Sequence, residues 1–353
     1  MKRPRMIGMS LGVQFQFLII NFLIGISLLI TFPANASSAD RPSLILVVGA
    51  PGDAEYATNF AHQANLWEKA CEQADCTHVT IGLSATTQTN DYDLLKQFLA
   101  DEAKDGLGQL WLVFIGHGTF DGKEARFNLR GPDLPTADLA VWLQPFHRPL
   151  ALIDTTSCSA PFINKLSGQD RVIIAATRSG HEQNFTRFGQ YFAEAINNPE
   201  ADLDKDGQIS LLEAFLTASR KATEFYKLQG RLVTEHALLD DNGDGRGTPA
   251  DWFRGLRATK KPKDAGAVDG LRAHQFCLVP SESERRLTPT QRARRDALER
   301  EVFHYRDKKS EIPEDQYYAQ LETLLLEIAR FYASNSPAPV TGTNAPAREL
   351  ETP

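Results

Sequence analysis

A histidine and a cysteine, each placed just after an apolar run, are the residues whose types and spacing best fit a chemical function. Leu110–Ile115 runs into a Gly-His-Gly sequence centred on His117, and Leu150–Ile153 runs into a polar stretch that ends in Cys158. Cysteine is a nucleophile as its thiolate, and a nearby imidazolium lowers the pKa of the thiol. Histidine can also protonate a leaving amine. The pair therefore indicates nucleophilic attack on an acyl group.

A parallel sheet would place both residues at one edge. Apolar runs of this length beside turn residues are typical of buried parallel strands, whose carboxyl ends carry the catalytic groups. Because one helix-containing crossover separates the two runs, we expect neighbouring strands. The N–H groups of Gly118 and Cys158 would then face the oxyanion of the intermediate. The simpler alternatives are a turn histidine without a function and a buried core cysteine.

The remaining pattern alternates strands with helices. We expect strands at 43–48, 78–83, 110–115, 150–153 and 171–175. We expect helices at 55–75, 91–103, 136–143 (with Thr136 as a cap), 188–196 and 211–226. The alternation predicts an α/β fold, a three-layer αβα sandwich around a mainly parallel sheet.

The two strand-end motifs resemble the caspase/legumain-type cysteine peptidases, also called the hemoglobinase fold, over roughly residues 43–195. The resemblance implies a cysteine endopeptidase with a His117/Cys158 dyad, an oxyanion hole from the Gly118 and Cys158 amides, and no organic cofactor. The substrate would be a peptide or protein. Residues 175–183 are similar to the legumain loop that lines the pocket for the residue before the cut, which places Arg178, Ser179 and Glu182 beside the substrate.

Two departures from the family pattern leave a second interpretation open. Cys158 is followed by Ser159-Ala160-Pro161, where the family usually has an acidic or small residue and then Ser-Gly. The loop 49–53 lacks the arginine that legumains place there. The alternative is a catalytically inactive peptidase-fold protein that acts as a calcium-dependent binding or scaffold module. A hydrolase and a transpeptidase would differ only in the final nucleophile.

An acidic loop at 202–213 has the spacing of an EF-hand. Carboxylates occupy positions 1, 3, 5 and 12, glycine occupies position 6, and an apolar residue occupies position 8. This pattern predicts a structural Ca²⁺ site, and residues 188–250 also resemble uncharacterised bacterial caspase-like proteins that carry calcium-loop sequences. The predicted ligands are Asp202, Asp204, Asp206, Gln208 (through its carbonyl) and Glu213.

A second segment, 240–251, is a weaker copy of this loop. Asp240 and Asp244 occupy positions 1 and 5, but Gly247 replaces the apolar residue and Asp251 stands at position 12. A second calcium site and a turn-rich surface loop are equally open interpretations.

The amino-terminal segment is typical of a secretory signal peptide. Three basic residues (Lys2, Arg3 and Arg5) precede the apolar stretch Phe15–Phe32 and the small residues before Ser37. We therefore expect residues 1–36 to be removed from an exported protein, periplasmic or secreted. An uncleaved membrane anchor is the alternative, and only then would the chain contact a membrane.

The charge of the chain excludes nucleic-acid binding, and the spacing of its cysteines excludes a zinc site. The formal net charge is −7 and no basic block is present, which excludes a nucleic-acid-binding protein. The four cysteines do not have the spacing of a zinc site. Cys71 and Cys76 form either a local disulfide or two buried free thiols.

The chain is expected to divide into five parts. A catalytic α/β domain at 42–200 follows the signal peptide 1–36, and a calcium-loop extension at 201–280 packs on it. A capping-box sequence at 288–291 opens a helical hairpin at 287–333. The last segment, 334–353, has the composition of a disordered tail.

Overall fold

A computed structural model of the chain describes residues 40–84, 89–261 and 267–335. All of the described residues belong to one compact unit of the chain, the second of the two into which it divides at Ser37/Ser38. The predicted signal peptide lies outside the described residues. Within the three described ranges, no helix combines the length and the apolarity that crossing a membrane requires.

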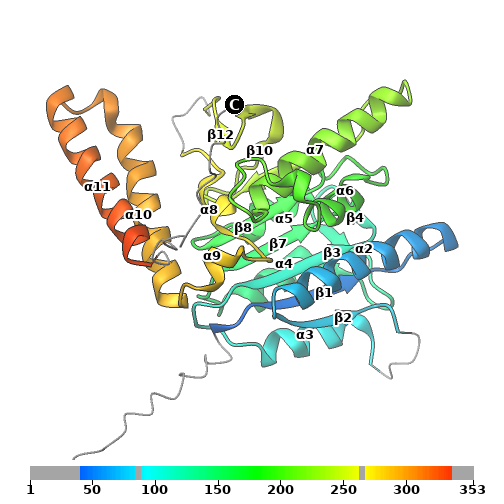
Figure 1. Cartoon of the computed structure of the whole chain (residues 1–353). Coiled ribbons are helices and arrows are strands. Elements are labelled where there is room, and N and C mark those ends of the chain that lie inside the picture. The colour runs from blue at the N-terminus through cyan, green and yellow to red at the C-terminus, as the bar shows by residue number, and fades with distance from the viewer. Residues whose placement is uncertain (1–39, 85–88, 262–266, 336–353) are drawn as a thin grey trace, which may run out of the picture. The chain divides into compact units, whose positions relative to one another are not determined.

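A seven-stranded sheet forms the centre of the second unit, with the order β10-β9-β8-β7-β3-β1-β2 (Figure 1). Its first five strands in the chain are parallel to one another, whereas β9 pairs antiparallel with β8 and β10 pairs antiparallel with β9. All residues of β1, β3 and β7 are buried, which explains why these strands are apolar on both faces. The strands are β1 (Ser43–Val48), β2 (Thr77–Ile81), β3 (Leu110–Ile115), β7 (Leu150–Asp154), β8 (Arg171–Ala175), β9 (Leu238–Asp240) and β10 (Thr248–Pro249).

Helices cover both faces of the sheet, so the predicted three-layer α/β sandwich is confirmed. Alternate residues of β3 point to opposite faces. Trp111 packs with the apolar side chains of α2, α6 and α7, and Leu112 packs with those of α3, α4 and α5. The helices are α2 (Ala54–Gln73), α3 (Asp91–Asp101), α4 (Thr136–Leu143), α5 (Ala160–Leu166), α6 (Phe188–Ala195) and α7 (Leu211–Leu228).

Short strands that the sequence pattern did not predict lie outside the main sheet. A three-stranded antiparallel sheet follows β3, and a two-stranded one follows β10. The cap predicted at Thr136 is wrong, because Pro135 is the N-cap and the Thr136 hydroxyl donates to the Ala125 carbonyl (2.6 Å). These strands are β4 (Gly118–Phe120), β5 (Ala125–Phe127), β6 (Leu134–Pro135), β11 (Phe253–Arg254) and β12 (Arg257–Ala258).

The carboxyl-terminal helices α10 and α11 pack together as a hairpin (Figure 1). The capping box at Thr288 is present as predicted. The last helix continues to Asn335, two residues into the predicted tail, and residues 336–353 lie outside the described ranges. The helices of this region are α8 (Leu271–Gln275), α9 (Glu282–Arg285), α10 (Pro289–Asp307) and α11 (Glu314–Asn335).

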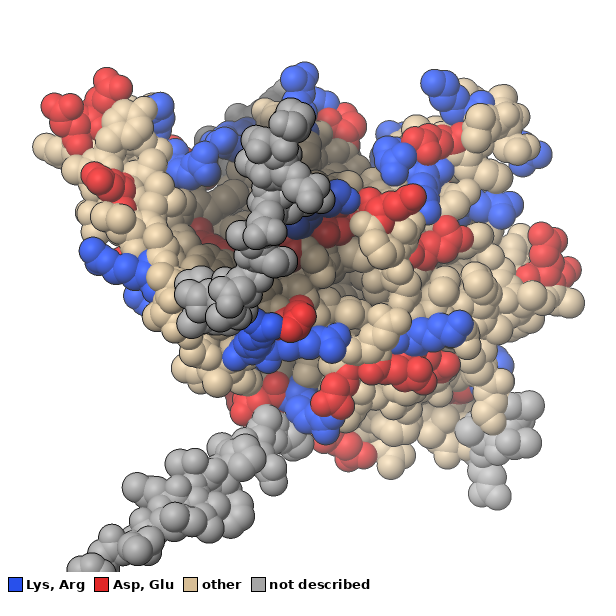
Figure 2. All heavy atoms as spheres, viewed as in Figure 1, with Lys and Arg blue, Asp and Glu red and all other residues tan. Residues whose placement is uncertain are grey.

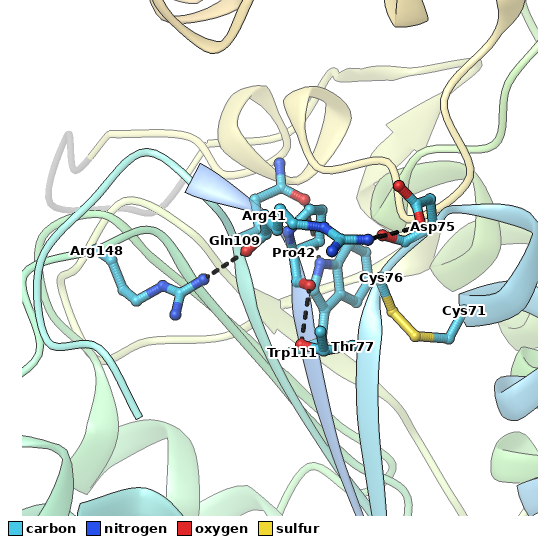
Figure 3. Close-up of a disulfide and its surroundings, with 9 residues drawn as sticks. All are labelled: Arg41, Pro42, Cys71, Asp75, Cys76, Thr77, Gln109, Trp111 and Arg148. Carbon is cyan, nitrogen blue, oxygen red and sulfur yellow. Dashed lines mark hydrogen bonds and ion pairs between the residues drawn. A yellow bond between two sulfur atoms is a disulfide. The ribbon is translucent and has the colours of Figure 1, made fainter. Parts of the chain in front are cut away.

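Cys71 and Cys76 form a disulfide, the first of the two alternatives (Figure 3). It joins the last turn of α2 to the residue before β2, across a Cα–Cα distance of 5.1 Å. An ion pair between Arg41 and Asp75 (2.7 Å) lies beside it. The disulfide therefore fixes the connection from the first crossover helix to the edge strand of the sheet.

Acidic and basic side chains are interspersed on the surface of this unit. On the face that Figure 2 shows, lysines and arginines alternate with aspartates and glutamates. The ion pairs of this unit include Arg126 with Asp121 (2.9 Å) and Lys260 with Asp251 (2.7 Å).

Candidate active site and acidic loops

The two strand-end motifs meet in the fold. Strands β3 and β7 are neighbours, as predicted. The Gly118 N–H donates to Ser157 Oγ (3.3 Å), and the Ser157 hydroxyl donates to the Gly118 carbonyl (3.1 Å). A Cβ atom on Gly118 would lie 2.2 Å from the Ser157 carbonyl oxygen, so this approach requires glycine. The residue after His117 thus contacts the residue before Cys158.

Cys158 occupies a strained turn between β7 and α5. Its φ angle is +59°, which is uncommon for a residue other than glycine. Hydrogen bonds from the end of β8 hold the turn, because Thr177 Oγ1 accepts from the Ala160 N–H (3.1 Å) and Ser159 Oγ accepts from the Thr177 N–H (3.2 Å). Strain of this kind concentrates at functional sites, where the surrounding structure maintains it.

The His117 ring is oriented by one hydrogen bond and three aromatic rings. Nε2 lies 3.2 Å from the Pro51 carbonyl oxygen, just before α2. The rings of Tyr56, Phe60 and Phe185 surround the imidazole at centroid distances of 4.7, 5.3 and 5.9 Å. A hydrogen bond from Nε2–H to Pro51 selects the tautomer in which Nδ1 carries the lone pair, so Nδ1 is the atom able to take a proton.

The Cys158 thiol is buried in a setting that keeps it neutral. The residue is 1% exposed, and burial followed by the charge of Asp154 raises the pKa of the thiol to about 11. Asp154 is itself fully buried at the end of β7. Burial raises its pKa to about 7, although Thr156 donates two hydrogen bonds to its Oδ1. The sequence analysis did not identify Asp154, because an aspartate that ends a strand is indistinguishable from a turn residue.

The segment between β8 and α6 contacts the backbone of Cys158. The Cys158 N–H donates to the Glu182 carbonyl (2.9 Å). Both N–H groups predicted to form the oxyanion hole are therefore engaged in this structure, that of Gly118 by Ser157 and that of Cys158 by Glu182. A substrate carbonyl would have to replace these two acceptors.

The three predicted substrate-binding residues have different environments. The Glu182 carboxylate accepts hydrogen bonds from the backbone of Arg178 (3.0 Å) and of His236 (3.1 Å), and its other oxygen lies 2.6 Å from His236 Nδ1. Ser179 Oγ accepts from the His181 N–H (3.3 Å). The Arg178 side chain is 62% exposed although its Nε lies 3.1 Å from Glu182. Arg178 is thus the most accessible of the three. His236 escaped the sequence analysis because its partner is distant in the chain.

A cavity of about 550 Å³ adjoins the histidine. Tyr56 and Phe185, which both contact the imidazole, also line this cavity, together with Arg187 and Arg231. No motif in the sequence indicated it, because its lining comes from α2, from the end of α7 and from two separate loops.

The acidic loop at 202–213 brings three carboxylates together. Oxygens of Asp202, Asp204 and Asp206 lie within 4.8 Å of one another, an arrangement that could hold a metal ion. The Gly207 N–H donates to Asp202 Oδ2 (3.1 Å), and the φ angle of Gly207 is +88°, as the sharp turn requires.

The other two predicted ligands lie differently. The Glu213 carboxylate is buried and accepts from the Leu203 N–H (2.7 Å) and from the N–H and hydroxyl of Ser210 (2.8 and 2.9 Å), which forms the capping box of α7. The Gln208 side chain donates to Asp206 Oδ2 (2.9 Å). Glu213 therefore closes the loop by hydrogen bonds and is not among the three clustered carboxylates.

No family model and no curated protein matches this chain. Solved structures do: the Drosophila initiator caspase Dronc is 14% identical with a TM-score of 0.40, over 60% of this chain and 83% of Dronc. Caspase-1 from Spodoptera frugiperda is 10% identical with a TM-score of 0.36, over 59% of this chain and 89% of the caspase. A protein of Geobacter sulfurreducens is 10% identical with a TM-score of 0.33, over 52% and 89%. The chain is thus similar in structure to two caspases at low sequence identity.

Proposed function

We propose that this chain is an exported cysteine endopeptidase in which Cys158 attacks a peptide carbonyl and His117 carries the proton. The observation that supports this most is the direct contact between Gly118 and Ser157, which holds the two motifs side by side. The positive φ angle of Cys158 also supports this proposal, because backbone strain is found mainly at functional sites, where the surrounding structure maintains it.

The reaction follows from the groups at this edge of the sheet. The Cys158 thiol loses its proton to His117, and the thiolate sulfur bonds to the carbonyl carbon. The N–H groups of Gly118 and Cys158 stabilise the oxyanion. When the intermediate collapses, the carbon–nitrogen bond breaks and the amine leaves with the proton from His117. Water then hydrolyses the thioester.

The structure described above corresponds, in this proposal, to a resting state. The Cys158 thiol is buried and the two N–H groups have acceptors within the protein. Substrate binding would displace the segment between β8 and α6, and the released N–H groups would receive the substrate carbonyl. The exposed guanidinium of Arg178 lies on this segment and would contact the bound peptide.

Calcium and export complete the proposal. The oxygen-only cluster of Asp202, Asp204 and Asp206 suits Ca²⁺, which would fix the loop between the 3₁₀ turn Pro199–Ala201 and α7. A disulfide is typical of proteins from oxidising compartments, which supports export.

Active-site labelling tests the proposal. We expect a peptide acyloxymethyl ketone to form one adduct on Cys158, detected by intact-mass analysis with calcium and with chelator. Cys158→Ala should abolish the adduct and His117→Ala should slow it at least 100-fold. Cys277→Ala is the matched control, because Cys277 carries the other free thiol in the described part of the chain, and it should not change the labelling. Peptide cleavage by Cys158→Ala at the wild-type rate would exclude this function.

A catalytically inactive, calcium-dependent binding protein is the second candidate. The observation in its favour is the buried, neutral Cys158 thiol whose backbone N–H is already bonded. This candidate predicts no adduct on Cys158 in either calcium or chelator. Rapid labelling of the isolated protein would exclude it.

A further inference from the structure

The loop after β9 adopts the backbone conformation of the acidic loop at 202–213. In both loops the residues at positions 4 and 6 have positive φ, 64° and 88° in the first loop and 79° and 73° in the second. In both loops, the N–H group at position 5 donates to the side chain at position 3, and the N–H group at position 7 donates to the side chain at position 5. In the second loop these bonds run from Asp244 N to Asn242 Oδ1 and from Arg246 N to Asp244 Oδ1, each 2.8 Å.

A distant aspartate closes the second loop. In the first loop Glu213 accepts from the N–H groups at positions 2 and 3 and from the hydroxyl at position 9. Asp269 makes the same three bonds in the second loop, to Asp241 N (2.9 Å), Asn242 N (3.1 Å) and Thr248 Oγ1 (2.5 Å). Asp251, at position 12 by sequence, instead lies on the surface and pairs with Lys260 (2.7 Å).

Position 1 of this loop holds a buried carboxylate oxygen without a partner. Asp240 is 1% exposed, and its Oδ1 accepts from the Gly243 N–H of the loop (3.1 Å). Its Oδ2 is buried and has no hydrogen-bond partner among the described residues, as is also true of Asp202 Oδ1 in the first loop. A buried acceptor without a donor is costly, and a cation in the loop would satisfy it.

Other carboxylates lie in the same loop as Asp240. Asp241 and Asp244 add two more carboxylates to the same loop. Asp241 points elsewhere, since its carboxylate accepts from the N–H groups of Gly270 (2.9 Å) and Ala273 (2.7 Å) at the start of α8. The carboxylates of Asp240 and Asp244 thus both accept hydrogen bonds from backbone N–H groups of the same loop, those of Gly243 (3.1 Å) and Arg246 (2.8 Å).

We propose that Asp240, Asn242 and Asp244, with the Arg246 carbonyl, form a second divalent-cation site, and that Asp269 closes it from outside the loop. The oxygen-only ligand set suits Ca²⁺. A cation here would tie the antiparallel edge of the sheet to α8, because Asp240 lies in β9 and Asp269 lies two residues before α8. The site is independent of the chemistry at Cys158.

Calcium stoichiometry of the full chain tests this proposal. We expect calorimetric titration with CaCl₂ to give two ions per wild-type chain, one for Asp204→Ala, and none for the double variant Asp204→Ala/Asp244→Ala. Both substituted aspartates are exposed, so each variant should fold, which circular dichroism checks. Asp269→Asn in the Asp204→Ala background should weaken the remaining ion at least tenfold.

Asp251→Asn is the matched control. In the Asp204→Ala background it should leave one ion bound with unchanged affinity. The proposal is overturned if Asp204→Ala binds no calcium, or if Asp244→Ala leaves the stoichiometry of that background at one. If the wild type binds one ion and Asp204→Ala still binds it, this site would be supported and calcium binding at 202–213 would be excluded.

Discussion

Asp154 shows how a single side chain links burial, charge and the reactivity of Cys158. It is fully buried, its Oδ2 has no hydrogen-bond partner in the described ranges, and its charge raises the pKa of the Cys158 thiol. Burial raises the pKa of Asp154 from 3.8 to about 7. Near neutral pH the carboxyl is therefore half-protonated, and the environment of the nucleophile depends on pH.

Asp154→Asn should remove a pH dependence of stability. An acid whose pKa is higher in the folded state contributes stability that is complete below its unfolded pKa and is lost as pH rises through its folded pKa. Wild-type stability should therefore fall between about pH 4 and pH 8 by up to about 4 kcal/mol relative to the variant. Urea unfolding of both proteins at pH 5 and pH 8 measures the difference. Parallel curves with the same offset at both pH values would contradict the argument.

At the scale of elements, the segments that could be predicted from the sequence are those whose burial requires a regular pattern of apolar residues. Strands β1 and β3 were predicted at their observed bounds, because burial on both faces makes them continuously apolar. Strands β9 and β10, of three and two residues, leave no periodicity to read. The places of His117 and Cys158 after strand ends followed from the apolar runs before them, whereas the contacts of Asp269 could not be predicted, because its partners lie in a separate loop.

The disulfide between α2 and β2 should contribute to stability through the unfolded chain. It spans a sequence separation of only 5, for which chain entropy gives about 2 kcal/mol. The double variant Cys71→Ala/Cys76→Ala should therefore unfold at a lower urea concentration than the oxidised wild type. Dithiothreitol should lower the wild-type midpoint to a similar value and leave that of the variant unchanged. Equal midpoints for the oxidised wild type and the variant would show that the bond adds nothing.

For the whole molecule, a buried ion-pair cluster attaches the hairpin α10–α11 to the rest of the unit. Arg295 is 10% exposed at its side chain and pairs with Glu284 of α9 and with Asp296 (2.8 Å). Glu299 accepts from Gln275 of α8 (3.1 Å). Arg285 of α9 donates to the carbonyl of Gln73, the last residue of α2. His117 lies near the opposite end of α2, because it contacts the carbonyl of Pro51, just before the helix begins. A helix of 20 residues is about 30 Å long, so the attachment lies far from the dyad.

Arg295→Ala should therefore release the hairpin without changing the reactivity of Cys158. The substitution leaves the buried Glu284 carboxylate without its cation, which costs about 3–5 kcal/mol, whereas Asp296 keeps its ion pair with Arg272 (3.8 Å). Hydrogen exchange should become faster in 287–335, while peptide acyloxymethyl ketone labelling of Cys158 keeps its wild-type rate. Arg294→Ala is the matched control, because the Arg294 side chain is 57% exposed and its pair with Glu327 (3.5 Å) contributes at most about 1 kcal/mol. A large change in labelling by Arg295→Ala alone would mean that the hairpin is coupled to the site across the whole unit.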